Sequence, residues 1–480
     1  MINTILPTPK KTEVFEGVSP VNAAIWTEHA PFQPHLSVFT DAMKRIFSVD
    51  VAIAGGGIRV EFDPSLPADH YTLDTRDGCV LRASDVEGLC YAFATVLHAV
   101  KVKDGSITCE KAYIEDHPEK PYRALMVDLV REWIPAHRIY HYIDVCFMQK
   151  LNHLHLHLVD DQRFTLPSKA FPLLPTPNEH YTEEDIRGFC AYAKMRGITL
   201  IPELEIPGHA RHLTKSYPEI FGNELPEGAS ATIVTEEGLT ISAANIVCAG
   251  KQACLDGIRA ILEEICALFP DSPYLHLGGE EAVIQAWTYC DCCKAYMKEH
   301  GIEDEYDLYS EFIARVTDMV FDLGRTPIVW EGFPKKGSHR INRNTIVIAW
   351  ESHYQLVTDL LADGFKIINA SWQPLYIVDG FELRWGPQEI MEWNVYNWQH
   401  WWEHSVAKLN PIHVPPTDQV LGAQICAWQT TYEQNIQFVM ENCTALSERL
   451  WTVKRLWDIE RYRKRHKEST RRIARLIQDR

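Results

Sequence analysis

The spacing of hydrophobic residues predicts a repeating strand–helix pattern over most of the chain. From Pro121 onward, short apolar runs of strand length alternate with longer stretches that have helical spacing. Eight such runs over about 300 residues are typical of a parallel (β/α)8 barrel. We therefore predict a TIM barrel over residues 119–445. Its strands are expected at 124–127, 153–158, 199–202, 274–277, 327–330, 346–349, 366–370 and 420–425.

The residues on either side of this repeat follow other patterns. Turns of Gly, Pro and Asp-Gly separate four strand-like runs at 51–54, 59–62, 70–74 and 79–82. A helical pattern follows at 85–98, so we expect a small α/β domain over residues 1–118. The segment 446–480 is rich in Lys and Arg and carries apolar residues at helical spacing. This pattern predicts a basic amphipathic helix that packs on the barrel.

Composition and charge narrow the classes of partner. The 480 residues are 46% hydrophobic and 23% charged, and the formal net charge of −18 argues against nucleic acid as a partner. No apolar run approaches the roughly 18 to 20 residues of a membrane helix. Prolines stand near the start of the chain, where a signal peptide would carry its apolar region. We therefore expect a cytoplasmic protein with no membrane partner. Its oligomeric state stays open, with a homodimer as one alternative.

The thirteen cysteines are an odd number and show no framework spacing, which is typical of free thiols in a reducing compartment. The one cluster is Tyr289-Cys290-Asp-Cys292-Cys293. A zinc knuckle would need a second pair at a suitable distance, and none is obvious in the sequence. We therefore interpret these cysteines as reduced structural thiols.

The densest chemistry lies in Tyr274-Leu-His-Leu-Gly-Gly-Glu-Glu281, an apolar run that ends in two glycines and two carboxylates. The glycines allow a sharp exit from a strand. Two carboxylates held together repel, so that one tends to keep its proton while the other ionises, which provides an acid and a base. The alternative is a helix N-terminus at which acids favour the dipole.

A second group of polar residues alternates with leucines. His153, His155 and His157 share one face of a predicted strand, and Asp160 and Asp161 follow it. Three histidines and two aspartates suggest a metallohydrolase as an alternative.

Four segments, in order along the chain, resemble motifs of glycoside hydrolase family 20, the β-N-acetylhexosaminidases. They are Arg123-Ala-Leu-Met-Val-Asp128-Leu-Val-Arg131, Leu151-Asn-His-Leu-His-Leu-His-Leu-Val-Asp160-Asp161-Gln162, Ile201-Pro-Glu203-Leu-Glu205-Ile-Pro-Gly208-His209 and the Tyr274–Glu281 segment. The resemblance extends from about residue 70 to about residue 435. It implies an exo-acting, retaining glycosidase on a barrel, with no metal in the site and no cofactor.

The resemblance also implies a role for particular residues. Glu281 is expected to be the acid/base, and Glu280 is expected to orient the substrate's 2-acetamido group. That group supplies the nucleophile, so the reaction passes through an oxazolinium intermediate. Asp160 and His209 are expected to support the acid/base. The residues expected to shape the sugar pocket are Arg123, Trp330, Trp350, Tyr376 and Trp428.

The chain departs from the family pattern at three positions. Glu280 stands where the family has aspartate, and its side chain is longer by about 1.5 Å. Val378 and Thr430 stand where polar or acidic residues would bind the outer hydroxyls. Two further functions therefore stay open. One is a glycosidase for a modified or non-acetylated hexose, with Glu280 as nucleophile. The other is a carbohydrate-binding protein without catalysis.

Overall fold

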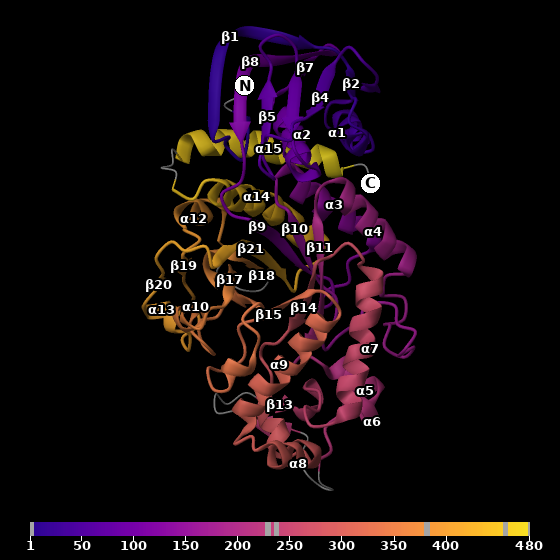
Figure 1. Cartoon of the computed structure of the whole chain (residues 1–480), viewed down its shortest axis with the longest axis vertical. Coiled ribbons are helices and arrows are strands. Elements are labelled where there is room, and N and C mark those ends of the chain that lie inside the picture. Colours follow the sequence, from indigo (N-terminus) through magenta and orange to yellow (C-terminus); the bar gives the residue numbers. More distant parts are fainter. Residues whose placement is uncertain (1–3, 226–231, 235–239, 379–384, 455–458, 479–480) are drawn as a thin grey trace.

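The computed structural model describes residues 4–225, 232–234, 240–378, 385–454 and 459–478. A small domain lies at one end of the molecule, and a larger domain makes up the rest (Figure 1). Within the described residues, no helix is both long enough and apolar enough to cross a membrane.

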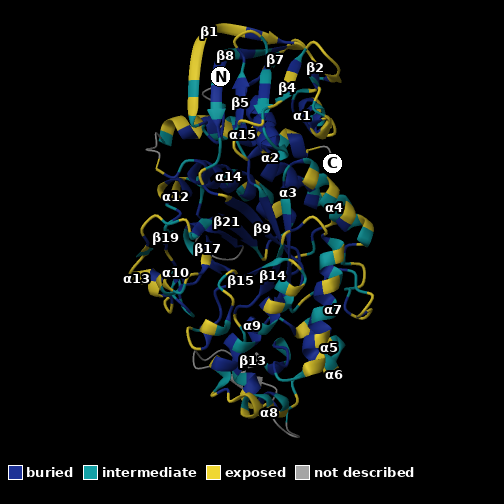
Figure 2. Ribbon diagram, viewed as in Figure 1, coloured by how far each residue is buried: buried dark blue, intermediate teal, exposed yellow. Residues whose placement is uncertain are grey.

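The larger domain is a closed barrel of eight parallel strands, as the spacing of apolar runs predicted. The sheet runs in the order β17-β16-β15-β14-β11-β10-β9-β21, and pairing of β17 with β21 closes it. Side chains on both faces of these strands are buried, which is why the strands read as apolar runs (Figure 2). The strands are β9 (Tyr122–Asp128), β10 (His153–His157), β11 (Thr199–Ile206), β14 (Tyr274–Gly278), β15 (Thr326–Trp330), β16 (Ile346–Ala349), β17 (Lys366–Asn369) and β21 (Val420–Trp428).

Helices and short loop elements connect the barrel strands. The main α-helices are α3 (Ala136–Met148), α4 (Glu183–Met195), α7 (Gln252–Leu268), α8 (Asp291–His300), α9 (Glu305–Asp322) and α14 (Tyr432–Trp451). The shorter ones are α5 (Arg211–Ser216), α6 (Pro218–Phe221), α10 (Val357–Ala362), α11 (Trp372–Leu375), α12 (Pro387–Glu392) and α13 (Val406–Leu409). Strand β18 (Tyr376–Val378) pairs with β21. Two small antiparallel sheets pair β12 (Thr232–Val234) with β13 (Thr240–Ser242) and β19 (Asn397–Trp398) with β20 (Ile412–His413). Single 3-10 turns are η3 (Ala243–Asn245), η4 (Ile284–Thr288) and η5 (Ser338–Arg340).

The small domain is one mixed sheet with two helices. Its strand order is β1-β8-β5-β6-β4-β2-β3, and β7 pairs with β8. The strands are β1 (Lys11–Val21), β2 (Ala24–Thr27), β3 (Ala52–Ile53), β4 (Ile58–Phe62), β5 (Tyr71–Asp74), β6 (Val80–Ala83), β7 (Lys101–Lys103) and β8 (Ser106–Asp116). The two helices are α1 (Leu36–Phe47) and α2 (Val86–Ala99), and a short 3-10 turn, η2 (Ala30–Phe32), precedes α1. The sequence patterns missed β1, β2, β7, β8 and α1.

The C-terminal helix α15 (Ile459–Ile477) packs on the barrel and also on the small domain. It lies between the two domains and contacts α1 of the small domain as well as α3 and α14 of the barrel (Figure 1). Part of its basic face is buried there: Arg472 donates to the carbonyl of Leu97, and Arg465 donates to Thr8. These arginines therefore tie the domains together and do not face solvent.

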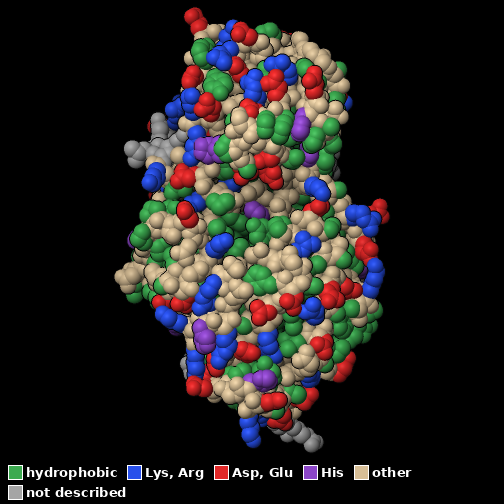
Figure 3. Space-filling view, viewed as in Figure 1, with side chains coloured by type: hydrophobic (Ala, Val, Ile, Leu, Met, Phe, Trp, Pro, Cys, Tyr) green, Lys and Arg blue, Asp and Glu red, His purple; other side chains and the backbone are tan. Residues whose placement is uncertain are grey.

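A buried polar cluster also joins the two domains. Lys150, which precedes β10, lies 3.2 Å from Asp116 of β8 and donates to Tyr71 of β5 at 2.7 Å. Trp451 of α14 donates to the other oxygen of Asp116 at 2.7 Å. Because the buried ammonium and carboxylate are paired and hydrogen-bonded, neither charge is left uncompensated. On the face of the molecule in Figure 3, acidic and basic side chains are interspersed.

Candidate active site

Polar and aromatic side chains gather at the carboxyl ends of the barrel strands. They come from β9, β10, β11, β14, β15, β16 and β21, although these strands are spread along the chain from Tyr122 to Trp428. The pocket among them has a volume of about 190 Å³. Its lining residues are Arg131, Glu280, Glu281, Trp330, Trp350, Trp372, Tyr376, Val378, Trp428 and Gln429.

Two glycines make the turn that presents the carboxylates of Glu280 and Glu281. Gly278 and Gly279 have φ of 66° and 92°, in the left-handed region that favours glycine. A Cβ on Gly278 would lie 2.0 Å from the carboxylate of Glu205, which receives a hydrogen bond from the Gly279 amide. Glu281 itself has φ of 45°, an uncommon conformation for a residue with a side chain. The chain therefore leaves β14 in a conformation that aims both carboxylates at the pocket.

The two carboxylates have different surroundings. Burial raises the pKa of Glu280 to about 8, and the negative charge of Glu281 adds to this effect. The side chain of Glu281 is half exposed. Partial burial raises the pKa of Glu281. The hydrogen bond and the positive charge of His209 outweigh this effect and hold the pKa below its usual range. Near neutral pH the pair thus holds one proton and one negative charge, as expected of a coupled acid and base.

His209 links this pair to a buried aspartate. Its Nδ1 lies 3.3 Å from Asp160, and its Nε2 lies 3.2 Å from Glu281 and 3.5 Å from Glu280. Burial lowers the pKa of His209, but the charge of Asp160 outweighs it and raises the pKa well above its usual range. The structure therefore brings together the polar residues that the sequence assigned to the acid/base, with an imidazolium facing both carboxylates.

Glu203, which the sequence analysis left without a role, organises the histidines of the barrel wall. Its buried carboxylate lies 3.2 Å from His155 and 2.9 Å from His276, and it contacts His157 as well. Burial raises the pKa of Glu203, but these imidazoles outweigh burial and hold the pKa well below its usual range. Glu203 also accepts a hydrogen bond from the indole N–H of Trp330 at 2.7 Å. One carboxylate therefore holds in place both the histidines of the barrel wall and an aromatic ring of the pocket.

The geometry does not support the three-histidine metal site that the sequence left as an alternative. His153, His155 and His157 are alternate residues of β10, so that successive members are about 6.6 Å apart along the strand. His153 stacks on Tyr122 at the other end of the barrel, 4.5 Å between ring centroids. His155 and His157 both lie against the carboxylate of Glu203, toward the carboxyl end of β10 from His153. One zinc ion cannot span all three, since Zn–N bonds are about 2.0–2.1 Å long.

The assignment of Arg123 to the sugar pocket is wrong. Arg123 stands at the amino end of β9, is fully buried, and donates to the carbonyls of Lys120 and Lys150 and to the hydroxyl of Tyr91. It therefore belongs to the junction with the small domain. Arg131, at the carboxyl end of the same motif, lines the pocket instead and pairs with Asp160 at 2.7 Å. Active sites of barrels lie at the carboxyl ends of strands, and this rule separates the two arginines by position alone.

Aromatic rings form most of the pocket wall. Trp330 and Trp428 have centroids 6.0 Å apart, and Trp350 lies 6.2 Å from Tyr376 with nearly parallel planes. Trp372, which the sequence analysis did not single out, stacks on Tyr376 at 4.3 Å. Trp350 donates its indole N–H to the carbonyl of Glu331 at 2.9 Å, which fixes the ring. Such an apolar, rigid wall suits the C–H face of a sugar ring.

The two remaining departures from the family pattern differ in position. Val378 lines the pocket as expected. Thr430 is buried and accepts a hydrogen bond from Asn435 at 3.1 Å, and the neighbouring Gln429 lines the pocket in its place. Of these two neighbours, Gln429 is therefore the polar residue that reaches the pocket.

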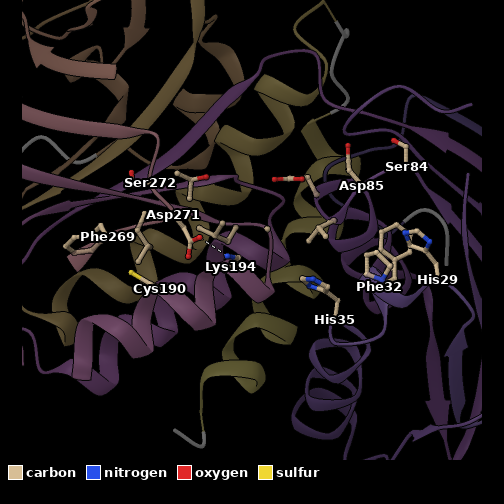
Figure 4. Close-up of a pocket in the computed structure, with 17 residues that line it drawn as sticks. His29, Phe32, His35, Ser84, Asp85, Cys190, Lys194, Phe269, Asp271 and Ser272 are labelled. Atoms are coloured by element: carbon tan, nitrogen blue, oxygen red, sulfur yellow. Dashed lines mark hydrogen bonds and ion pairs between the residues drawn. The ribbon is translucent and has the colours of Figure 1, made fainter. Parts of the chain in front are cut away.

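A larger hollow of about 520 Å³ lies elsewhere, between the small domain and the barrel. Figure 4 shows His29, Phe32 and His35 on one side of it and Cys190, Lys194 and Asp271 on the other. It also reaches Thr199 and Ser272, at the amino ends of β11 and β14. Because this is the end of the barrel opposite the carboxylates, it is not part of the active site.

Comparisons with known proteins agree with this arrangement. The model of "Glycosyl hydrolase family 20, catalytic domain" matches residues 121–454. A β-hexosaminidase of Vibrio furnissii is 28% identical over 400 residues, which are 78% of this chain and 64% of that protein. A β-hexosaminidase of Akkermansia muciniphila is 32% identical over 285 residues, 56% of each chain. This chain thus spans less than two thirds of the length of either relative.

Solved structures show the same fold. The exo β-N-acetylglucosaminidase of Vibrio harveyi superposes with a TM-score of 0.83 at 22% identity, over 98% of this chain and 76% of that one. The β-N-acetylhexosaminidase of Bacteroides fragilis superposes with a TM-score of 0.77 at 22% identity, over 96% and 93%. With the family match covering most of its length, the chain belongs to glycosyl hydrolase family 20.

Proposed function

We propose that the protein is an exo-acting, retaining β-N-acetylhexosaminidase that removes terminal β-linked N-acetylglucosamine or N-acetylgalactosamine from oligosaccharides or glycoconjugates. The observation that carries this proposal is the pair Glu280 and Glu281. They are the only carboxylates among the described residues that line the pocket, and they are adjacent in the sequence. The pocket is smaller than the roughly 300–1,000 Å³ typical of drug-sized ligands, which suits a single terminal sugar.

Adjacent carboxylates favour substrate-assisted catalysis over a protein nucleophile. Classical retaining glycosidases place two carboxyl groups on either side of the scissile bond, with the second as nucleophile. Here the substrate's acetamido oxygen attacks the anomeric carbon while Glu281 protonates the departing oxygen. Glu281, now ionised, then takes a proton from the water that opens the oxazolinium.

Binding of the substrate places the proton on the right carboxylate. In the free enzyme the proton of the pair is held mainly by Glu280, since burial raises its pKa. An acetamido N–H that donates to Glu280 stabilises its charged form and favours transfer of the proton to Glu281. His209 contacts both carboxylates, and Asp160 with Arg131 fixes it in place. The imidazolium also stabilises Glu281 when the acid has given up its proton.

The pH dependence follows from this shared proton. The acid step needs one proton in the pair, and that proton is lost as pH rises through the raised pKa of Glu280, about 8. We expect kcat/KM to be level near neutral pH, to fall above about pH 8, and to fall again in acid when both carboxyls are protonated. Rates measured from pH 4 to 10 test this profile. In Glu280→Gln, the pH at which kcat/KM falls on the alkaline side should change. If it stays near 8, the alkaline fall belongs to the titration of another group.

A second candidate keeps the barrel but makes Glu280 a nucleophile for a non-acetylated hexose. The observation in its favour is that Glu280 Oε2 is buried and has no hydrogen-bond partner among the described residues. A nucleophile must be ionised, however, and burial opposes ionisation of Glu280. A non-acetylated hexose brings no acetamido N–H to stabilise the charged form.

Two inhibitors separate these candidates. A thiazoline that mimics the oxazolinium should bind at least about 100-fold tighter than substrate, as expected of a transition-state analogue. A fluoro-sugar that traps an enzyme nucleophile should leave the mass of the intact protein unchanged. An adduct on Glu280, with weak thiazoline binding, would establish the nucleophile mechanism instead. A pocket that binds sugars but turns over no aryl glycoside would indicate the non-catalytic alternative.

Selectivity at the outer edge of the sugar should be modest. Val378 cannot hydrogen-bond a hydroxyl, and Gln429 offers a neutral amide where a carboxylate would form a charge-assisted bond. We expect gluco- and galacto-configured N-acetyl substrates to differ in kcat/KM by less than about 100-fold, or about 2.7 kcal/mol. Aryl N-acetylglucosaminide and N-acetylgalactosaminide give the ratio directly. The variant Gln429→Ala should bring the ratio closer to one, and strict selectivity in both enzymes would exclude Gln429 as the discriminating group.

We also propose that the protein acts in the cytoplasm, without a nucleic-acid or membrane partner. The odd number of cysteines and the net charge of −18 support this proposal. Fractionation of cells that express the natural gene, followed by activity assays, tests the location.

A further inference from the structure

Three cysteine side chains converge outside the active site. The Sγ of Cys248 lies 3.6 Å from the Sγ of Cys290 and 3.6 Å from that of Cys293, and all three sulfurs lie within 4.8 Å of one another. All three residues are buried. Cys290 and Cys293 have the C-x-x-C spacing of many metal sites, and Cys248 adds a third thiol that the sequence pattern did not reveal.

Backbone contacts hold the three segments together independently of the thiols. The amide of Cys248 donates to the carbonyl of Phe221 at 2.9 Å, and the amide of Asp291 donates to that of Glu224 at 2.9 Å. A Cβ on Gly250 would lie 2.5 Å from the carbonyl oxygen of Cys292, so only glycine allows so close an approach. The sulfurs are therefore brought together by a preformed framework.

The spacing of the sulfurs fits a metal better than a disulfide. In a disulfide the two sulfurs are about 2.05 Å apart. In a tetrahedral zinc site with Zn–S bonds of about 2.3 Å, two sulfurs are separated by about 3.8 Å. The observed 3.6 Å lies close to the second value.

The surroundings suit charged thiolates. Cys290 precedes the first residue of α8, so it and Cys293 stand at the helix N-terminus, where the dipole favours negative charge. The backbone N–H of Glu224 points at the Sγ of Cys290 from 3.3 Å. Lys251, three residues after Cys248, provides a cation that is held 3.3 Å from Glu224.

We propose that Cys248, Cys290 and Cys293 bind a structural zinc ion as thiolates. Binding releases three thiol protons, and the fourth position is left for water or for the carboxylate of Glu224. Soft thiolate ligands favour zinc over Mg²⁺ or Ca²⁺. This ion takes no part in the hydrolysis and is distinct from the excluded three-histidine site.

The site would fasten two loops of the active site to each other. Cys290 follows η4 in the loop that begins with Glu280 and Glu281, whereas Cys248 belongs to the loop that carries His209. The same loops already meet where Trp287 donates to the carbonyl of Val247 at 2.9 Å. An ion between these loops would help to fix the position of His209 relative to the two carboxylates. Loss of the ion should therefore lower stability mainly, and catalysis to a smaller extent.

Metal content of the tag-free protein tests the proposal. The wild-type chain, purified with a reductant and without chelator and then incubated with ZnCl2 and desalted, should contain about one zinc per chain by elemental analysis. X-ray absorption should show Zn–S distances of about 2.3 Å. With Co²⁺ in place of zinc, an intense thiolate-to-metal charge-transfer band should appear. Removal of the ion by a strong chelator should lower the melting temperature.

Variants locate the ion. Cys248→Ser should lose the zinc and the cobalt band, whereas Cys254→Ser and Cys443→Ser, which replace other buried cysteines, should keep both. If Cys248→Ser does not fold, the metal content and cobalt spectrum of the wild type still decide. Zinc well below one per chain in the wild type would overturn the proposal, as would full zinc binding by folded Cys248→Ser. A disulfide between any two of the three cysteines after purification with reductant would overturn it as well.

Discussion

Replacing Glu281 by Gln is expected to lower kcat by about 10² to 10⁴, the usual contribution of general acid–base catalysis. The amide can donate a hydrogen bond to the glycosidic oxygen but cannot transfer a proton to it. Folding should be intact, because the side chain of Glu281 is half exposed and its one described hydrogen bond is to His209. The loss therefore reports on chemistry and not on stability.

The size of this loss should depend on the leaving group. A nitrophenolate leaves with little protonation, so that Glu281→Gln should be impaired least on nitrophenyl glycosides and most on alkyl or oligosaccharide substrates. Steady-state rates over a series of aryl and alkyl N-acetylglucosaminides, with circular dichroism as a check of the fold, measure the trend. Glu263→Gln, on the exposed surface of α7 and outside the pocket lining, is the matched control. A loss of equal size for every leaving group would remove Glu281 from the acid role.

The barrel could be predicted because of where its strands lie. Each barrel strand is buried on both faces, so its sequence is an apolar run that stands out from the helices around it. In contrast, β1 is mostly exposed over its eleven residues and has neither an apolar run nor regular alternation. Its conformation depends on pairing with β8, which is about ninety residues away in sequence. No local pattern can reveal such a partner.

The active site could be predicted only in part, for the same reason. The sequence places Glu280, Glu281, Asp160 and His209 at the ends of strands, and the barrel brings them together. Arg123 was misassigned because the motif match was not combined with the position of the strand: Arg123 stands at its amino end, whereas Arg131 follows its carboxyl end. Outside the active site, the contact between Cys248 and Cys290 was missed because the two residues are 42 positions apart, and only the fold shows that they meet.

Replacing Glu280 by Gln is expected to lower kcat by about 10² to 10³, as expected when an electrostatic group that stabilises the transition state is lost. The charge of Glu280 is needed when the acetamido group attacks, because positive charge then develops on its nitrogen. A glutamine side chain at this position would keep the size of the original and could accept the N–H, but it would carry no negative charge.

The loss in Glu280→Gln should depend little on the leaving group, in contrast to Glu281→Gln, because Glu280 acts on the attacking acetamido group and not on the departing oxygen. Thiazoline affinity should fall in parallel with kcat, since the inhibitor carries the same developing charge. Glu280→Asp is the matched control: it keeps the charge and withdraws it by about 1.5 Å. It should lose less than Glu280→Gln. Full activity of Glu280→Gln on acetylated substrates would show that its charge is not used, because a neutral side chain would then orient the acetamido group equally well.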